Sequence, residues 1–177
     1  MNVVAYFTAV VARSGSAWRA RDVELDEEAG LDDVADQLRA VAVDDEPVIA
    51  VLEHEDEWFA LFRVDGDDDP RLFVSDLPSA SRSGFSELLA AAAEIEVADD
   101  DTDPDDGARD EDDEEPLGDP LGGGGAVWAG DVDILEDLGV PGGSLRRLVE
   151  EHVEDPAAVI ADLGERVGFA ELLEALR

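Results

Sequence analysis

An acidic segment in the middle of the chain restricts the possible folds more than any other feature. Between residues 99 and 115 there are twelve Asp or Glu residues and one Arg, and prolines and four consecutive glycines follow. A segment with so much like charge and so few apolar side chains cannot bury enough surface to offset the entropy lost on ordering it. We therefore expect a disordered linker at residues 96–125. It would separate an N-terminal domain, residues 1–95, from a smaller C-terminal unit, residues 126–177.

The N-terminal part contains the patterns of a small sheet with two helices. Runs rich in β-branched and aromatic residues are separated by short turns of Gly, Asp and Ser, which predicts a hairpin and an antiparallel meander. Two other segments repeat apolar residues every three to four positions, as one face of a helix does. The strands are expected at residues 3–13, 17–25, 48–52, 58–64 and 71–75, and the helices at residues 31–42 and from Ser83 onward. Together they predict an α+β domain of about five antiparallel strands with two helices on the sheet.

The C-terminal part contains short apolar patterns that predict a small bundle of short helices. Gly139 followed by Pro141 ends one helix, Ser144 can cap the next, and Asp155-Pro156 combines an N-cap with proline at the first helical position. A unit of about 50 residues is only marginally stable by itself. We expect it to dock on the N-terminal domain or on a partner, and the sequence leaves both arrangements open.

The whole chain is strongly acidic. Its 177 residues include 48 Asp and Glu against 12 basic residues, all of them Arg, for a net charge of −36. Such a charge repels nucleic-acid phosphates and anionic membranes, and no window approaches the roughly 18 apolar residues of a membrane span. We expect a cytoplasmic protein with a basic protein partner and no direct contact with nucleic acid or membrane. The same residue usage also fits a high-G+C genome or a salt-adapted proteome.

The run from Arg71 to Leu89 is a long stretch with only two acidic residues, and it is the candidate site. It reads as a strand, a Ser-rich turn and the start of a helix, where free backbone N–H groups can receive an anion. The predicted partner-binding residues are Arg71, Asp76, Ser79, Ser81, Arg82 and Ser83. The same side chains could instead cap the helix and shape the turn. A third interpretation is a small-ligand-binding domain or enzyme that uses the Ser75–Arg82 turn and nearby carboxylates.

Common catalytic and metal-binding signatures fail on identifiable residues. The chain has no Cys, which excludes disulfides, thiolate chemistry and cysteine zinc sites. The acidic turn at residues 65–76 spaces its Asp residues as a calcium loop does, but Pro70 stands where that loop needs Gly. His54 and His152 lie far apart in the sequence and we expect both to be structural. We therefore expect no catalytic residues, no metal and no cofactor.

Several motifs together resemble one known family. These are VSDLPSASRSGFSELL, the preceding strand pair WFALFRV and RLFVSD, and the C-terminal WAGDVDILEDLGV. In combination they resemble the tRNA adenosine deaminase-associated proteins of high-G+C Gram-positive bacteria, and the likeness covers both folded parts. The resemblance implies association with the tRNA-specific adenosine deaminase, whose gene typically neighbours that of the family and which converts a wobble adenosine to inosine. It brings no assigned active-site residues with it.

The chain itself lacks the chemistry of that deaminase. A zinc deaminase needs an H-x-E motif and P-C-x-x-C, because zinc activates the attacking water and the Glu transfers the proton. Here there is no Cys, so the P-C-x-x-C motif cannot occur. The sequence therefore predicts a non-enzymatic accessory protein that binds a basic partner, the neighbouring deaminase or another tRNA-handling protein. A weaker alternative is a nucleic-acid mimic whose acidic linker occupies a basic tRNA-binding groove.

Overall fold

The computed structural model describes residues 6–54, 57–98, 128–152 and 154–176. The predicted linker at residues 96–125 lies outside the described residues, except that its first three residues continue a helix. The prediction that the linker is disordered is therefore not tested.

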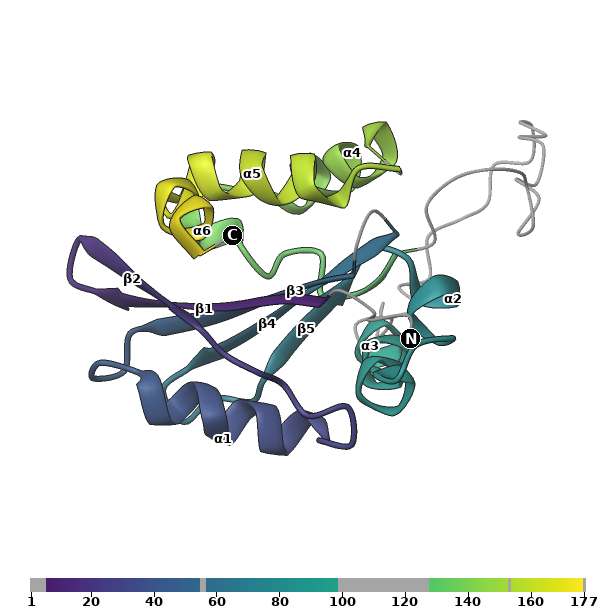
Figure 1. Ribbon diagram of the computed structural model, residues 1–177, viewed down its shortest axis with the longest axis horizontal. Coiled ribbons are helices and arrows are strands. Elements are labelled where there is room, and N and C mark those ends of the chain that lie inside the picture. Colours follow the sequence, from purple (N-terminus) through teal and green to yellow (C-terminus); the bar gives the residue numbers. More distant parts are fainter. Residues whose placement is uncertain (1–5, 55–56, 99–127, 153, 177) are drawn as a thin grey trace, which may run out of the picture.

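A six-stranded antiparallel sheet forms the centre of the protein (Figure 1). Its strands lie in the order β2-β1-β3-β4-β5-β6. Their bounds are β1 (Tyr6–Ser14), β2 (Ala17–Asp22), β3 (Pro47–His54), β4 (Trp58–Asp65), β5 (Arg71–Val74) and β6 (Ala129–Gly130). The N-terminal hairpin, the meander and the α+β class are confirmed. The sequence did not predict β6, which has two residues and pairs with the outer edge of β5.

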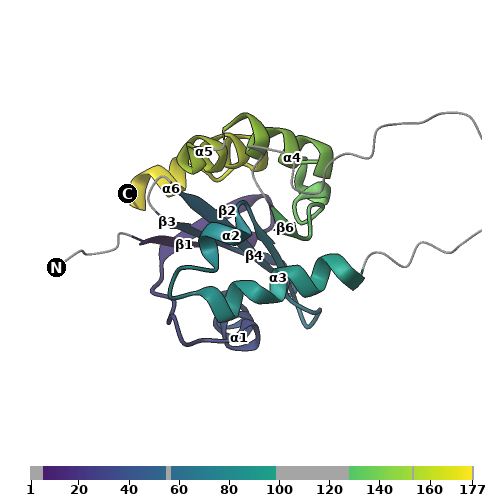
Figure 2. The ribbon, with the colours of Figure 1, turned by 90° about the vertical axis from the view of Figure 1, so that its right-hand side faces the viewer.

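Helices cover both faces of the sheet (Figures 1 and 2). On one face lie α1 (Leu31–Val41), α2 (Leu77–Ala80) and α3 (Ser86–Ala98). On the other lie the 3₁₀ helix η1 (Glu136–Leu138), α4 (Gly142–Glu151), α5 (Pro156–Val167) and α6 (Ala170–Leu176). None of the helices in the described part of the chain combines the length and apolar character needed to cross a membrane.

The central strands supply apolar side chains to two cores, because successive residues of a strand point to opposite faces. In β3, Val48, Ala50 and Leu52 face α1 and α3, while Ile49 and Val51 face the C-terminal helices. The strand expected at residues 48–52 is confirmed, and helices bury both of its faces. Docking of the C-terminal helices, which the sequence left open, thus takes place on the second face of the sheet. The domain boundaries at residues 95 and 126 stay a prediction.

Helix starts agree with capping rules at some positions and differ at others. The Asp155 carboxylate accepts a hydrogen bond from Ala158 N at 3.0 Å, as its N-cap pattern predicts. Ser144 was wrongly expected to cap a helix, because α4 already begins at Gly142, after Pro141. The helix expected from Ser83 begins at Ser86 instead. The short helix α2 precedes it, capped by Asp76.

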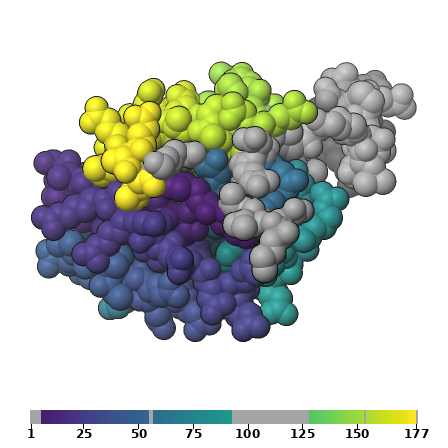
Figure 3. Space-filling view, in the orientation of Figure 1, coloured from purple at the N-terminus to yellow at the C-terminus, as the bar shows by residue number. Residues whose placement is uncertain are grey.

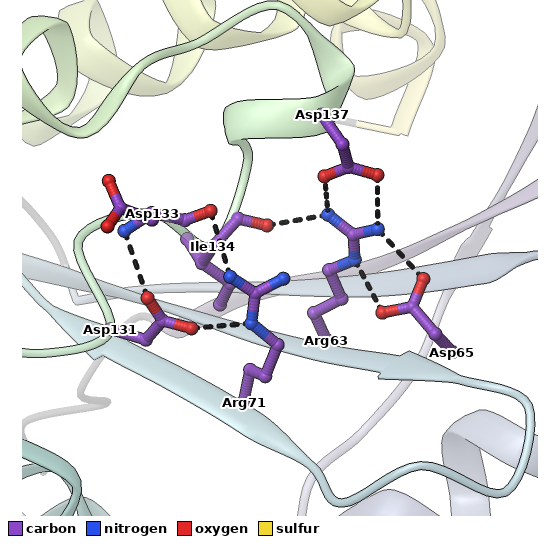
Figure 4. A network of polar contacts seen from close by, with 7 residues as sticks. All are labelled: Arg63, Asp65, Arg71, Asp131, Asp133, Ile134 and Asp137. Carbon is purple, nitrogen blue, oxygen red and sulfur yellow. Dashed lines mark hydrogen bonds and ion pairs between the residues drawn. The ribbon is translucent and has the colours of Figure 1, made fainter. Parts of the chain in front are cut away.

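Two arginines fasten the C-terminal segment to the sheet (Figure 4). The buried Arg63 of β4 donates to the Asp137 carboxylate and to Ile134 O, both at 2.7 Å, and to Asp65 at 2.8 Å. On β5, Arg71 donates to the Asp131 carboxylate and to Asp133 O. Burial disfavours the charged form of Arg63, but the hydrogen bonds to Asp137 and Asp65 outweigh it and raise the pKa of its guanidinium.

Close backbone approach fixes β6 against β5. Gly130 has φ of 97°, in the region that favours glycine. A Cβ at this position would also collide with the backbone of Leu72 and Phe73. Only glycine lets the two backbones pair here, next to the Arg71–Asp131 contact.

Replacing Arg63 with Met should lower the free energy of unfolding by about 1.5–3 kcal/mol, the range for hydrogen bonds to charged groups. Met keeps much of the apolar stem but leaves Asp137, Asp65 and Ile134 O without their donor. Urea denaturation at neutral pH measures the loss. The matched control is Arg166→Met, which removes the more exposed pair with Asp162 within one helix and should change stability by at most about 0.5 kcal/mol. Equal effects of the two variants would contradict the role of Arg63.

The ion pair should also give stability a defined pH dependence. The hydrogen bond from Arg63 lowers the pKa of Asp137 below its ordinary value of 3.8. A carboxyl whose folded-state pKa is depressed contributes stability that is complete above the unfolded-state pKa and is lost as the pH falls toward the folded-state pKa. Asp137→Asn should therefore destabilise the protein at neutral pH, and its stability difference from the wild type should shrink below about pH 4. Urea denaturation of both proteins across this range tests it, and a constant difference would contradict it.

Candidate functional site

The polar side chains of the predicted site mostly bond within their own turn. The Asp76 carboxylate accepts from Ser79 N at 3.0 Å and from Ser79 Oγ at 2.9 Å, which caps α2. Ser81 Oγ donates to Leu77 O, and Ser83 Oγ donates to Ala80 O. These bonds agree with the interpretation that the residues cap a helix and shape the turn. Their role in partner binding stays a prediction.

Two parts of the predicted region lie apart from this turn. Arg71 contacts the segment after β6 (Figure 4), so the structure does not group it with Arg82. Ser75 Oγ accepts a hydrogen bond from Phe59 N inside the protein. Ser75 and Asp76 border a cavity of about 10 Å³ beside His152, which holds at most one water molecule.

The remaining residues of the turn form one wall of an open groove of about 560 Å³. The other walls come from the start of β1, the loop after β2 and the adjacent ends of β3 and β4. We call it the Tyr6 groove. It is lined by Tyr6, Glu27, His54, Glu57, Ser79, Arg82, Ser83 and Gly84.

Aromatic rings hold Tyr6 in place in this groove. Its ring centroid lies 4.7 Å from that of His54 and 5.0 Å from that of Phe85, which meets it edge-on. His54 in turn stacks on the fully buried Trp58 at 5.5 Å. The indole Nε1 of Trp58 has no hydrogen-bond partner among the described residues. Packing between aromatic rings therefore positions Tyr6 and His54 on this side of the groove.

Carboxylates and a guanidinium give the groove two signs of charge. Glu57 Oε2 lies 3.0 Å from His54 Nδ1, although the angle is not that of a hydrogen bond. The Glu27 carboxylate packs against Gly84, where a Cβ would collide with it. The exposed Arg82 also lines the groove and donates a hydrogen bond to Ser79 Oγ at 3.2 Å. An aromatic face beside carboxylates suits an amine or a guanidinium ligand.

The surroundings of Tyr6 in the groove shift the pKa of its phenol. Burial raises the pKa of Tyr6 above its ordinary value, and the negative charge of Glu27 raises it further. Hydrogen bonds with the Gly84 backbone and the Ser83 side chain oppose this rise without cancelling it. Tyr6 therefore stays neutral and can donate a hydrogen bond over the physiological pH range.

Sequence reasoning missed half of the groove. Tyr6 and Glu27 come from segments that the sequence assigns to a strand and a loop, and His54 was expected to be only structural. They lie more than 20 residues from the turn in sequence, so no local pattern connects them with Arg82. Within the described ranges no cluster of three or more His, Asp or Glu side chains could hold a metal ion.

The antiparallel sheet with helices on both faces makes this a compact α+β protein. The open polar groove is its candidate site. Comparison with known families then places it more closely. The model of the Rv3753c-like tRNA adenosine deaminase-associated protein family matches residues 6–170. The chain belongs to this family, as the motif resemblance predicted. No curated protein and no solved structure matches it.

Replacing Glu27 with Gln should lower the pKa of Tyr6, because it removes one of the negative charges that oppose ionisation of the phenol. Burial remains, so the pKa should stay above its ordinary value of 10.0. Tyr6 is the only tyrosine in the chain, and phenolate absorbance therefore reports it alone. Circular dichroism at each pH shows that the protein remains folded during the titration.

The matched control for this titration is Glu174→Gln on α6, outside the groove. It removes the same charge and should leave the Tyr6 pKa nearly unchanged. Identical titration curves for the wild type and Glu27→Gln would show that Glu27 does not act on the phenol.

Proposed function

We propose that the protein is a non-catalytic, cytoplasmic accessory protein that binds the tRNA adenosine deaminase. The family description supports the association, since it names deaminase-associated proteins rather than the deaminase. The absence of Cys from this chain supports a non-deaminase role, because the chain cannot supply the thiolate ligands of that zinc site. Its net charge of −36 favours a basic partner surface.

The observation that carries the proposal is the two-signed lining of the Tyr6 groove. A Lys or Arg side chain of the deaminase enters beside Tyr6 and is held by Glu27 and Glu57, with the aromatic face below its cation. Arg82, which also lines the groove, meets a carboxylate or carbonyl oxygen of the same segment. Because positive and negative groups of the partner segment must both find their counterparts, the groove fixes how that segment is aligned. Net charge alone cannot do this.

Two charge-reversal variants, one of which makes the protein less acidic and one more acidic, test whether the Tyr6 groove binds the deaminase. Co-purification of the deaminase with the full chain should be strong at low salt and weaker at high salt, because exposed charges are screened. Glu27→Lys with Glu57→Lys should raise the Kd about tenfold or more, a loss of about 1.4 kcal/mol. Arg82→Glu should also weaken binding, although it makes the protein more acidic.

The controls lie on α4, whose charged side chains are exposed and on the other face of the sheet. Glu150→Lys with Glu151→Lys matches the first variant in charge, and Arg147→Glu matches the second. Both should change binding by no more than their effect on net charge. No co-purification at any salt concentration would overturn the partner. Loss of binding on deletion of residues 99–115, with no effect of the groove variants, would overturn the groove as its site.

A further inference from the structure

The outer strand of the sheet presents two arginines on one face. The strand β2 pairs only with β1, so its other edge borders no strand of the described chain. Trp18 and Ala20 pack toward the C-terminal helices. Arg19 and Arg21 point to the opposite face, across from Ala12 and Val10 of β1. Figure 3 shows this hairpin at the surface, between α1 and the C-terminal helices.

A small cavity of about 70 Å³ lies beside these two arginines. It is lined by Val10, Ala12, Arg19, Arg21, Val41 and Val43. Helix α1 packs mainly on β3 and β4, and its last residue Val41 borders this cavity.

Arg19 and Arg21 lack the ion pairs that most other arginines of this acidic protein make. Arg13 lies near Glu46, Arg39 pairs with Asp36, and Arg166 pairs with Asp162. No carboxylate of a described residue lies within ion-pair distance of Arg19 or Arg21. Two unpaired cations beside an apolar cavity therefore present a local chemistry opposite to that of the rest of the surface.

We propose that the β2 edge binds an extended acidic segment of another protein, which adds to the sheet as a further strand. Main-chain hydrogen bonds to a sheet edge give such complexes affinity, and alternate side chains give them specificity. Acidic side chains two positions apart lie on one face of the added strand and meet Arg19 and Arg21.

Two other roles of the arginines make different predictions. Charged residues on an edge strand can serve only to prevent unwanted pairing, and then no segment binds. Nucleic-acid phosphates would also pair with arginine, but the excess of negative charge on the molecule repels them, and the aliphatic cavity offers them no contact. The proposed site shares no residue with the Tyr6 groove, so the two can be tested separately.

Fluorescence anisotropy with labelled peptides and the full-length protein tests the proposal. The probe is a short peptide of alternating Glu and Val, which places its carboxylates on one face of a strand. One comparison peptide has the same composition with its Glu residues grouped, and a second carries a central Pro, which removes a backbone donor. The alternating peptide should bind about tenfold more tightly than either.

Matched variants assign the binding to β2. Arg19→Glu or Arg21→Glu should each abolish it, whereas Arg147→Glu on α4 carries the same charge change and should leave it unchanged. Both β2 positions are exposed, and an unchanged melting temperature confirms that the variants fold. The proposal is overturned if all three peptides bind equally or if RNA competes with the peptide. It is also overturned if the β2 edge instead pairs two copies of this chain, in which case Arg21→Glu dissociates that complex and does not change peptide binding.

Discussion

The burial of the two central strands on both faces is the constraint on which the rest of the structure depends. The strands β3 and β4 have no face that can be left to water, since nearly every residue in them is buried. The helices of the N-terminal part cover one face only. The chain must therefore return after its acidic segment to supply α4, α5 and α6 for the other. Such a long insertion is thermodynamically acceptable because the entropy of loop closure grows slowly with length.

The scarcity of arginine makes each position of this residue informative. Arg63 and Arg71 bind carboxylates of the segment that follows β6, and they thereby hold two distant parts of the chain together. Those pairs are partly buried and join residues more than 50 positions apart. The exposed Arg82, Arg19 and Arg21 make no such contact. Arg146 and Arg147 on α4 are also exposed and make no ion pair with a described residue, so freedom from a carboxylate does not by itself mark a site. What distinguishes Arg82, Arg19 and Arg21 is their setting, a groove for the first and an open sheet edge for the other two.

Local periodicity predicted most of the fold and little of the candidate site. The strand patterns at residues 17–25 and 48–52 depend only on neighbouring residues, so the sequence reveals them. The strand β6 was missed because two residues, one of them glycine, carry no strand pattern. Arg71 was grouped with the Ser-rich turn because its actual partner, Asp131, lies 60 positions away. The Tyr6 groove was missed for the same reason, since its walls meet only in the folded sheet.

Net charge and local geometry should affect different steps of partner binding. The charge of −36 acts over a Debye length, about 8 Å at physiological ionic strength, and therefore speeds encounter with a basic surface. It carries no information about register. In the proposed complex, the carboxylates beside Tyr6 and the guanidinium of Arg82 act only after contact, in a groove whose aromatic wall is already packed. Salt should thus change mainly the association rate, whereas loss of the groove residues should change mainly the dissociation rate. An acidic protein can in this way associate rapidly with many basic surfaces and yet dissociate slowly only from the one that complements its groove.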